Sequence, residues 1–174
     1  MDREARLSQW SELVEIAGSR SEVGRQVQDM NFEDRRVVIT NVFAGKATGT
    51  LANRASSLGL YARWYREHIG LEVNFPPAED VAYAYVEYLR LSRAPPTRAQ
   101  GFVEALRFCL GALGADLDED VLSSKRLVGS VSRSYEAKRI TKKAPPVPAA
   151  VVVALEEFVL SKGDPLKRNL AGFI

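Results

Sequence analysis

The residues of this 174-residue chain that most clearly suggest chemistry are the cations between positions 125 and 143. This stretch holds seven basic residues and one acid, Glu136, so its net charge is +6, whereas the whole chain carries only +2. The basic residues are Lys125, Arg126, Arg133, Lys138, Arg139, Lys142 and Lys143. A local surplus of positive charge favours binding to a polyanion. The alternative is a solvated face that has no partner.

Three further groups of polar residues can contribute contacts. The first follows a glycine break and comprises Lys46, Thr48, Thr50, Arg54, Ser57 and Tyr61. The second comprises Thr97, Arg98, Gln100, Gly101 and Arg107, and the third adds Ser123, Ser124 and Ser130 to the cations at 125, 126 and 133. Hydroxyl and guanidinium groups at helix starts suit phosphate oxygens, and arginine or glutamine can also reach base edges. For each group the alternative is a solvated face with ordinary helix caps.

Residue patterns typical of catalysis or cofactor binding are missing from the sequence. There is no Walker-type glycine-lysine motif, no dinucleotide-binding glycine motif and no metalloprotease motif. A single cysteine and a single histidine exclude an internal disulfide and argue against structural zinc. We therefore expect no catalytic residue, no metal and no cofactor, and we expect Cys109 to be a small buried apolar side chain.

Hydropathy and the chain start indicate the compartment. No stretch approaches the roughly 18 apolar residues that a membrane-spanning helix needs, and the charged start has no apolar segment behind it. We expect an intracellular protein without membrane contact, and the sequence does not distinguish nucleus from cytoplasm.

Apolar spacing predicts an all-α chain. The predicted helices cover about 2–17, 20–29, 33–43, 50–69, 77–92, 98–113, 118–138 and 148–162, with another beginning near 164. The β-branched run within 33–43 leaves a strand open as an alternative there. Predicted helix starts are Asn31, Pro76-Pro77, Thr97 and Asp116 or Asp118, and predicted stops are Gly70 and Gly114.

Two helices carry apolar stripes that predict their buried faces. In the helix over 50–69 the stripe is Leu51, Ala55, Leu58, Ala62, Tyr65 and Ile69, with the stripe 50, 54, 57 and 61 beside it. In the helix over 118–138 the expected common face is Val121, Ser124, Val128, Val131 and Tyr135.

The charge distribution and the glycine and proline breaks divide the chain into four expected parts. Residues 1–45 form a helical extension with net charge −2, for which protein contact is the expected role. Residues 46–139 form a four-helix bundle, and 140–148 form a basic, proline-rich linker. Residues 149–174 are expected to begin another domain, because the sequence stops at Ile174 inside an apolar segment.

The order of these parts resembles the N-terminal, SAM-like core-binding domain of tyrosine recombinases of the phage-integrase type. The resemblance lies in helix order, helix lengths and the residues that begin and end the helices, across about residues 48–170. It starts at Thr50-Leu51 and Trp64-Tyr65, continues through Tyr88 to Ser92 and through Thr97 to Leu113, and ends with Lys138-Arg139 and Lys142 to Pro148.

The resemblance implies a duplex DNA partner and contact with other recombinase protomers. It implies that the chain supplies half of a C-shaped clamp in DNA recombination or integration. The arginines, lysine or histidine, and nucleophilic tyrosine of the family's catalytic domain have no match here, and Arg168 lacks the expected setting. The fragment is therefore expected not to cleave DNA, although its parent can be a strand-exchanging enzyme.

Two other functions stay open at the level of sequence. One is a helical protein-interaction or adaptor domain whose basic linker is merely solvated. The other is a small self-contained enzyme, which the missing nucleophile–base pairs disfavour.

Overall fold

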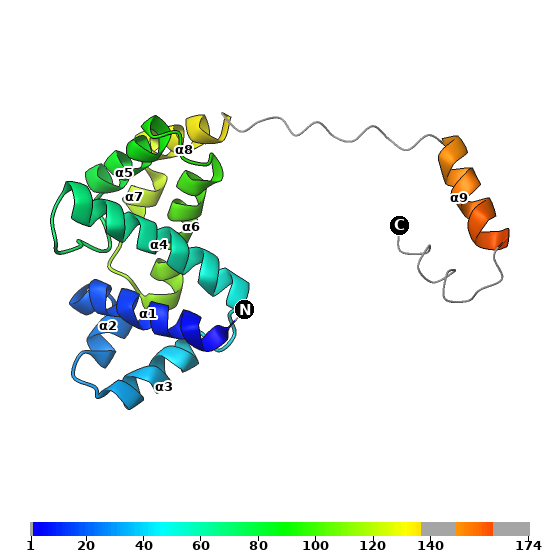
Figure 1. Ribbon diagram of the computed structural model, residues 1–174. Coiled ribbons are helices and arrows are strands. Elements are labelled where there is room, and N and C mark those ends of the chain that lie inside the picture. The colour runs from blue at the N-terminus through cyan, green and yellow to red at the C-terminus, as the bar shows by residue number, and fades with distance from the viewer. Residues whose placement is uncertain (1, 137–148, 162–174) are drawn as a thin grey trace. The chain divides into compact units, whose positions relative to one another are not determined.

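The computed structural model describes residues 2–136 and 149–161. Within these ranges every regular secondary-structure element is helical, so the prediction of an all-α chain is confirmed (Figure 1). The chain divides into one unit at 1–138 and a second at 139–174. No helix in the described ranges is both long enough and apolar enough to cross a membrane.

The first unit contains eight of the described α-helices. In chain order they are α1 Arg3–Ala17, α2 Glu22–Val27, α3 Phe32–Val42, α4 Thr48–His68, α5 Glu79–Leu91, α6 Thr97–Leu113, α7 Glu119–Ser123 and α8 Lys125–Glu136. A single 3₁₀ turn, Gly18–Arg20, joins α1 to α2. In the second unit the described helix is α9, Ala149–Ser161, which exposes Val151, Val152, Val153 and Phe158.

Several predicted helix boundaries coincide with the observed ones because local chemistry sets them. The side chain of Asn31 accepts a hydrogen bond from the backbone N–H of Asp34 and caps α3, which is a helix and not a strand. Asp118 caps α7 in the same way. Gly114 ends α6 with φ of 57°, a left-handed conformation that glycine adopts without strain.

Three predicted helix starts differ from the observed ones. Residues 76 and 77 precede α5, which begins at Glu79 after Ala78. Thr97 is the first residue of α6 and not its cap, because Pro96 occupies the cap position and makes no side-chain hydrogen bond there. Residues 20 and 21 belong to the 3₁₀ turn and its end, so α2 is shorter than expected.

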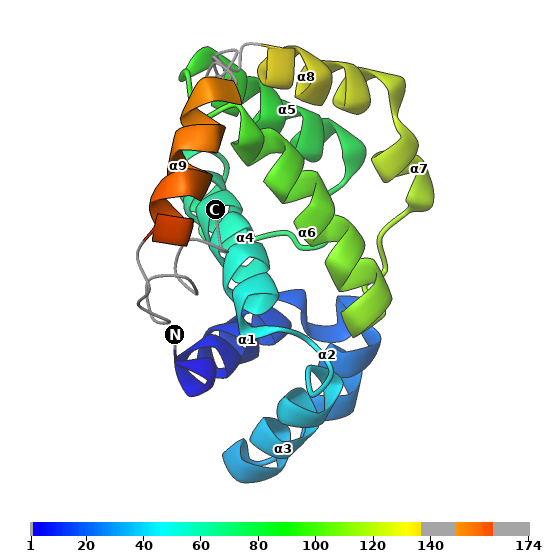
Figure 2. The same ribbon diagram turned by 90° about the vertical axis from the view of Figure 1, so that its right-hand side faces the viewer.

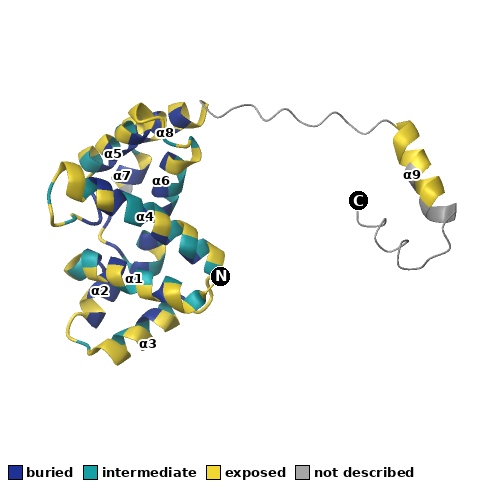
Figure 3. Ribbon diagram, in the orientation of Figure 1, coloured by how far each residue is buried: buried dark blue, intermediate teal, exposed yellow. Residues whose placement is uncertain are grey.

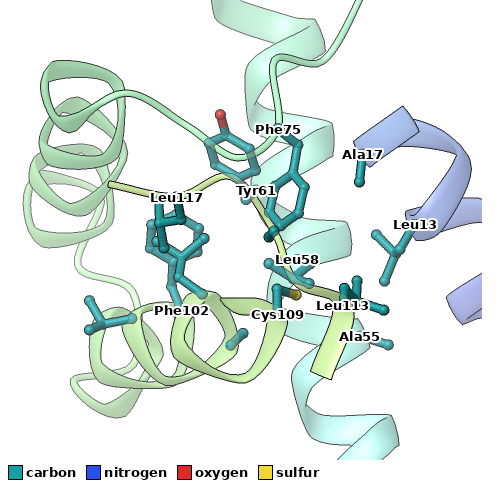
Figure 4. Close-up of a cluster of buried hydrophobic side chains, with 14 of the residues drawn as sticks. Leu13, Ala17, Ala55, Leu58, Tyr61, Phe75, Phe102, Cys109, Leu113 and Leu117 are labelled. Carbon is teal, nitrogen blue, oxygen red and sulfur yellow. The ribbon is translucent and has the colours of Figure 1, made fainter. Parts of the chain in front are cut away.

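The core is built around α4, which lies between α1 and α6 (Figure 4). Leu13 and Ala17 of α1, Ala55 and Leu58 of α4, and Cys109 and Leu113 of α6 meet in one buried cluster. Cys109 is fully buried, as expected for a small apolar side chain, and burial raises the pKa of its thiol to about 12.

The N-terminal helices belong to the same unit as the helices after residue 46. Trp10 of α1 is fully buried, its indole ring lies 4.8 Å from the ring of Phe43, and its N–H donates to the Leu51 carbonyl at 3.1 Å. The structure therefore has no domain boundary near residue 45, where the end of an N-terminal extension was expected, because α1 packs against one side of α4.

The buried side of α4 is wider than the predicted stripe. Leu51, Ala55, Leu58 and Ala62 are buried as expected, but Ile69 is 50% exposed. Figure 3 shows buried positions along much of α4, whereas α3 is mostly exposed. Because α4 packs against helices on two sides, Tyr61 and Trp64 are buried as well.

The single helix predicted over 118–138 is wrong in the structure, where α7 and α8 are separate. Ser124 breaks the chain between them with ψ of 122°, which is not helical. The break shifts the helical phase, so Leu127, Ser130, Val131 and Ser134 form the buried face of α8. Val128 and Tyr135, expected on that face, are 46% and 48% exposed.

Replacing Trp10 by alanine tests whether α1 is part of the core. We expect Trp10→Ala to lower the free energy of unfolding by about 3–5 kcal/mol, because it removes a large buried ring. The measurement is urea unfolding followed by far-UV circular dichroism. Glu12→Ala, at an exposed site on the same helix, is the control and should change stability by less than about 0.5 kcal/mol. Equal effects of the two changes would contradict a shared core.

Candidate nucleic-acid interface

Helices α4 and α6 run antiparallel and side by side (Figure 2). Near the α6 start, a Cβ atom added to Gly101 would lie 3.3 Å from the Ser57 hydroxyl oxygen of α4. At the opposite end, the Lys46 ammonium lies 5.9 Å from the centre of the Phe108 ring. Two predicted contact groups, which are about 50 positions apart in the chain, thereby lie on one surface.

We call this shared region the α4/α6 surface. It comprises Lys46, Thr50, Arg54, Gln100, Glu104 and Arg107. Lys46 and Arg107 are exposed, and the other four are partly exposed. Arg98, one residue into α6, is exposed at the Gln100 end.

Glu104 holds the middle of the α4/α6 surface. One of its carboxylate oxygens accepts a hydrogen bond from Gln100 at 3.1 Å, and the other lies 2.6 Å from a guanidinium nitrogen of Arg54. The hydrogen bond from Gln100 lowers the pKa of Glu104 most, and the contact with Arg54 lowers it next. Burial raises this pKa by less, and the charge of Arg107 lowers it further. The carboxylate is therefore ionised at neutral pH and balances one of the two nearby arginines.

The start of α4 differs from an open phosphate site. Arg3 of α1 donates to the carbonyl oxygens of Phe43 at 2.7 Å and Lys46 at 2.8 Å, and it reaches the Thr48 hydroxyl at 3.4 Å. The Thr48 hydroxyl, predicted as a phosphate donor, thus already has a partner. Sequence reasoning missed Arg3, and no local signal pointed to it, because its partners lie 40 or more positions away.

Tyr61 was predicted to contact DNA, and the structure corrects this. Its side chain is 1% exposed, and its hydroxyl donates to the Asn74 carbonyl at 2.9 Å. Its ring stacks on Phe102 at 5.2 Å, and burial raises its pKa. The polar stripe of α4 therefore ends at Ser57, since the next turn enters the core between α5 and α6.

The surface continues from α6 to the end of α8. A shallow groove is lined by Gln100, Val131, Ser132, Tyr135 and Glu136. It places the start of α6 beside the last turn of α8, which lies within the basic segment at 125–143. Arg133 is exposed on that same last turn.

The first turn of α8 is joined to α5 instead. Arg126 forms an ion pair with Glu79 and lies 4.9 Å from the centre of the Tyr83 ring. Ser124 donates to Glu79 at 2.5 Å, and Ser130 donates to Glu87. These three residues, predicted as contacts, dock α8 on α5, whereas Lys125 is exposed.

The remaining predicted contacts are Lys138, Arg139, Lys142 and Lys143, which lie outside the described residues. Within the described ranges, no three histidine, cysteine, aspartate or glutamate side chains gather into a group that can hold a metal ion.

The Glu79–Arg126 contact predicts a pH dependence of stability. Hydrogen bonds from Arg126 and Ser124 lower the pKa of Glu79 from 4.5 to about 2. Because the folded-state pKa is depressed, the contribution is full above the unfolded pKa and is lost as pH falls toward 2. We expect Glu79→Gln to be less stable than the native protein at pH 7, with a difference that shrinks between pH 4.5 and 2.

Thermal unfolding across a pH series measures this difference. Glu12→Gln, which makes the same charge change at an exposed site on α1, is the control and should follow the native protein throughout. A difference for Glu79→Gln that stays constant with pH would show that its carboxylate is not the titrating group.

The α4/α6 surface thus combines exposed cations, amide and hydroxyl groups, and one ionised carboxylate, and this combination can contact both phosphates and base edges. Comparison with known proteins gives no match to a protein-family model, to a curated protein or to a solved structure.

Proposed function

We propose that this chain binds duplex DNA as the core-binding half of a site-specific tyrosine recombinase or integrase. In this role it grips DNA during recombination or integration, together with other protomers, and does not cleave a strand by itself. The observation that carries the proposal is the α4/α6 surface, where Lys46, just before α4, lies on the same side of the molecule as Arg54 of α4 and Arg107 of α6.

The dimensions of this surface support binding to a duplex. The surface runs from Lys46, just before α4, to Arg54, and along α6 from Arg98 to Arg107. An α-helix rises about 1.5 Å per residue, so each stretch is long enough to cross a DNA groove. Exposed cations lie at both ends, Lys46 two residues before α4 and Arg98 at the start of α6. Cations at the two ends suit the two phosphate strands, and the polar groups between them suit base edges.

The charge of the chain supports the same reading. The basic segment at 125–143 begins with α8, and the groove beside Gln100 joins the last turn of α8 to the α4/α6 surface. We expect the cations of this segment, of which those after residue 136 lie outside the described ranges, to add phosphate contacts to such a complex. Each phosphate contact releases counterions, so the affinity of such a complex falls steeply with salt.

Replacing Arg107 tests the α4/α6 surface. We expect Arg107→Ala to weaken binding to a duplex of about 30 base pairs and to reduce the slope of log affinity against log salt by about one. Fluorescence anisotropy across a salt series measures both. The control is Arg66→Ala, which removes the same charge from the side of α4 that faces α1.

The two variants separate the surface from net charge. If Arg66→Ala reduces the slope as much as Arg107→Ala does, the effect belongs to the charge of the whole chain. If the native protein does not bind duplex DNA even at low salt, the proposed function is wrong.

The basic segment makes a separate contribution. We expect Lys142→Ala combined with Lys143→Ala to reduce the salt slope by about two, because two phosphate contacts are lost. The variant should leave the melting temperature of the first unit unchanged, because that unit ends at Lys138. A salt slope equal to that of the native protein would remove these lysines from the interface.

A second candidate function is a helical protein-interaction domain. The observation that favours it is a set of exposed apolar side chains after α4 and along α5, where Ile69, Leu71 and Leu91 are 50%, 85% and 70% exposed. Tyr88 of α5 is 38% exposed and lies 5.0 Å from the His68 ring of α4. Exposed apolar groups of this kind can mark a protein contact, and the salt series above distinguishes the two functions.

A further inference from the structure

An ionised carboxylate in the middle of a cationic surface calls for a physical explanation. Glu104 projects from α6 between Arg54 and Arg107, and its side chain is 38% exposed. A surface that only bound a row of phosphates would not contain the Glu104 carboxylate, because a carboxylate repels a phosphate at close range. The α4/α6 surface therefore has phosphate-binding ends and a centre that disfavours phosphate.

The same carboxylate suits a base edge. A carboxylate has about four acceptor positions on its two oxygens, and the structure shows two of them used, by Gln100 and Arg54. In the major groove cytosine presents a donor, its N4 amino group, and glutamate is a natural acceptor for it. Arg54 and Gln100 also hold the carboxylate in one position, which a selective hydrogen bond requires.

The close approach of α4 and α6 supports this orientation. Arg54 is 25% exposed and lies against α6, so its guanidinium faces Glu104 more than it faces solvent. Its charge offsets the carboxylate, which lowers the cost of bringing Glu104 near DNA. Gln100 lies one helical turn before Glu104 on α6, so both side chains present hydrogen-bonding groups along one line.

We propose that Glu104 is a specificity-determining residue that accepts a hydrogen bond from cytosine in the major groove and disfavours sequence-independent phosphate contacts. This inference rests on the proposed function and adds to it a preferred base. It assigns Arg54 a positioning role, in which the guanidinium holds Glu104 and does not contact phosphate.

The test begins with the native 174-residue chain and a library of random duplexes, from which bound sequences are selected and read. The affinity for a selected duplex is then compared with the affinity for a scrambled one. The same two measurements are made on Glu104→Gln and on Glu12→Gln, an equal change of charge at an exposed site on α1. Far-UV circular dichroism and the melting temperature establish that each variant is folded.

We expect the selected duplexes to share a cytosine at one position. Glu104→Gln should lose that preference, bind the scrambled duplex severalfold more tightly, and lower the ratio of selected to scrambled affinity by about tenfold. Glu12→Gln should leave the ratio within about twofold of the native value. Replacing the selected cytosine should weaken the native protein and leave Glu104→Gln unaffected.

The outcomes separate this inference from the function on which it rests. If the native protein binds duplexes but Glu104→Gln keeps the native ratio, the inference is overturned and the proposed function stands. Selection of no sequence by the native protein overturns the inference in the same way. If neither the native protein nor Glu104→Gln binds any duplex at low salt, the inference and the proposed function are both wrong.

Discussion

The burial of α4 between α1 and α6 is the constraint on which the remaining structure depends. A helix that packs on two sides has only a narrow strip of its circumference left for solvent, and on α4 part of this strip holds Thr50, Arg54 and Ser57. The position of α1 is set by Trp10, which fills the core and also hydrogen-bonds to the backbone of α4. The polar surface is therefore a product of core packing as much as of its own residues.

Ion pairs then decide which of the cations are available. Arg54 and Arg126 face carboxylates of neighbouring helices, whereas Lys46, Arg98, Arg107, Lys125 and Arg133 are exposed. Ion pairs at such partly exposed positions contribute about 0–1 kcal/mol, so they orient side chains at little cost in stability. Their main effect is to make the charge of the surface uneven, and an uneven charge distribution is better suited to recognition than a uniform one.

The sequence predicted most helices, because apolar spacing and local caps are properties of short segments. Asn31, Gly114 and Asp118 all act where they were expected. The predictions failed where two distant segments decide the outcome. Tyr61 has the spacing of a surface residue, but α5 and α6 enclose it.

The candidate site shows the same limit. Ser124 has a helical spacing with Val121 and Val128, yet its hydroxyl bonds to Glu79 of α5 and the helix breaks there. The pairing of Arg54 with Glu104 joins positions 50 apart, and spacing within one helix carries no information about such a pair. Residue types could therefore identify the candidate cations, but only the packing of helices shows which of them face a carboxylate of a neighbouring helix.

The contacts of Arg3 close the first part of the chain into a loop. Its guanidinium donates to the carbonyls of Phe43 and Lys46 and so joins the beginning of α1 to the residues after α3. Helices α1, α2 and α3 therefore lie in a segment whose two ends are joined by hydrogen bonds. Because these contacts hold the two ends of the loop together, they limit the conformations open to the segment between them. The Lys46 backbone, at one end of the α4/α6 surface, is thus held by a residue of the first helix, which itself carries none of the groups of that surface.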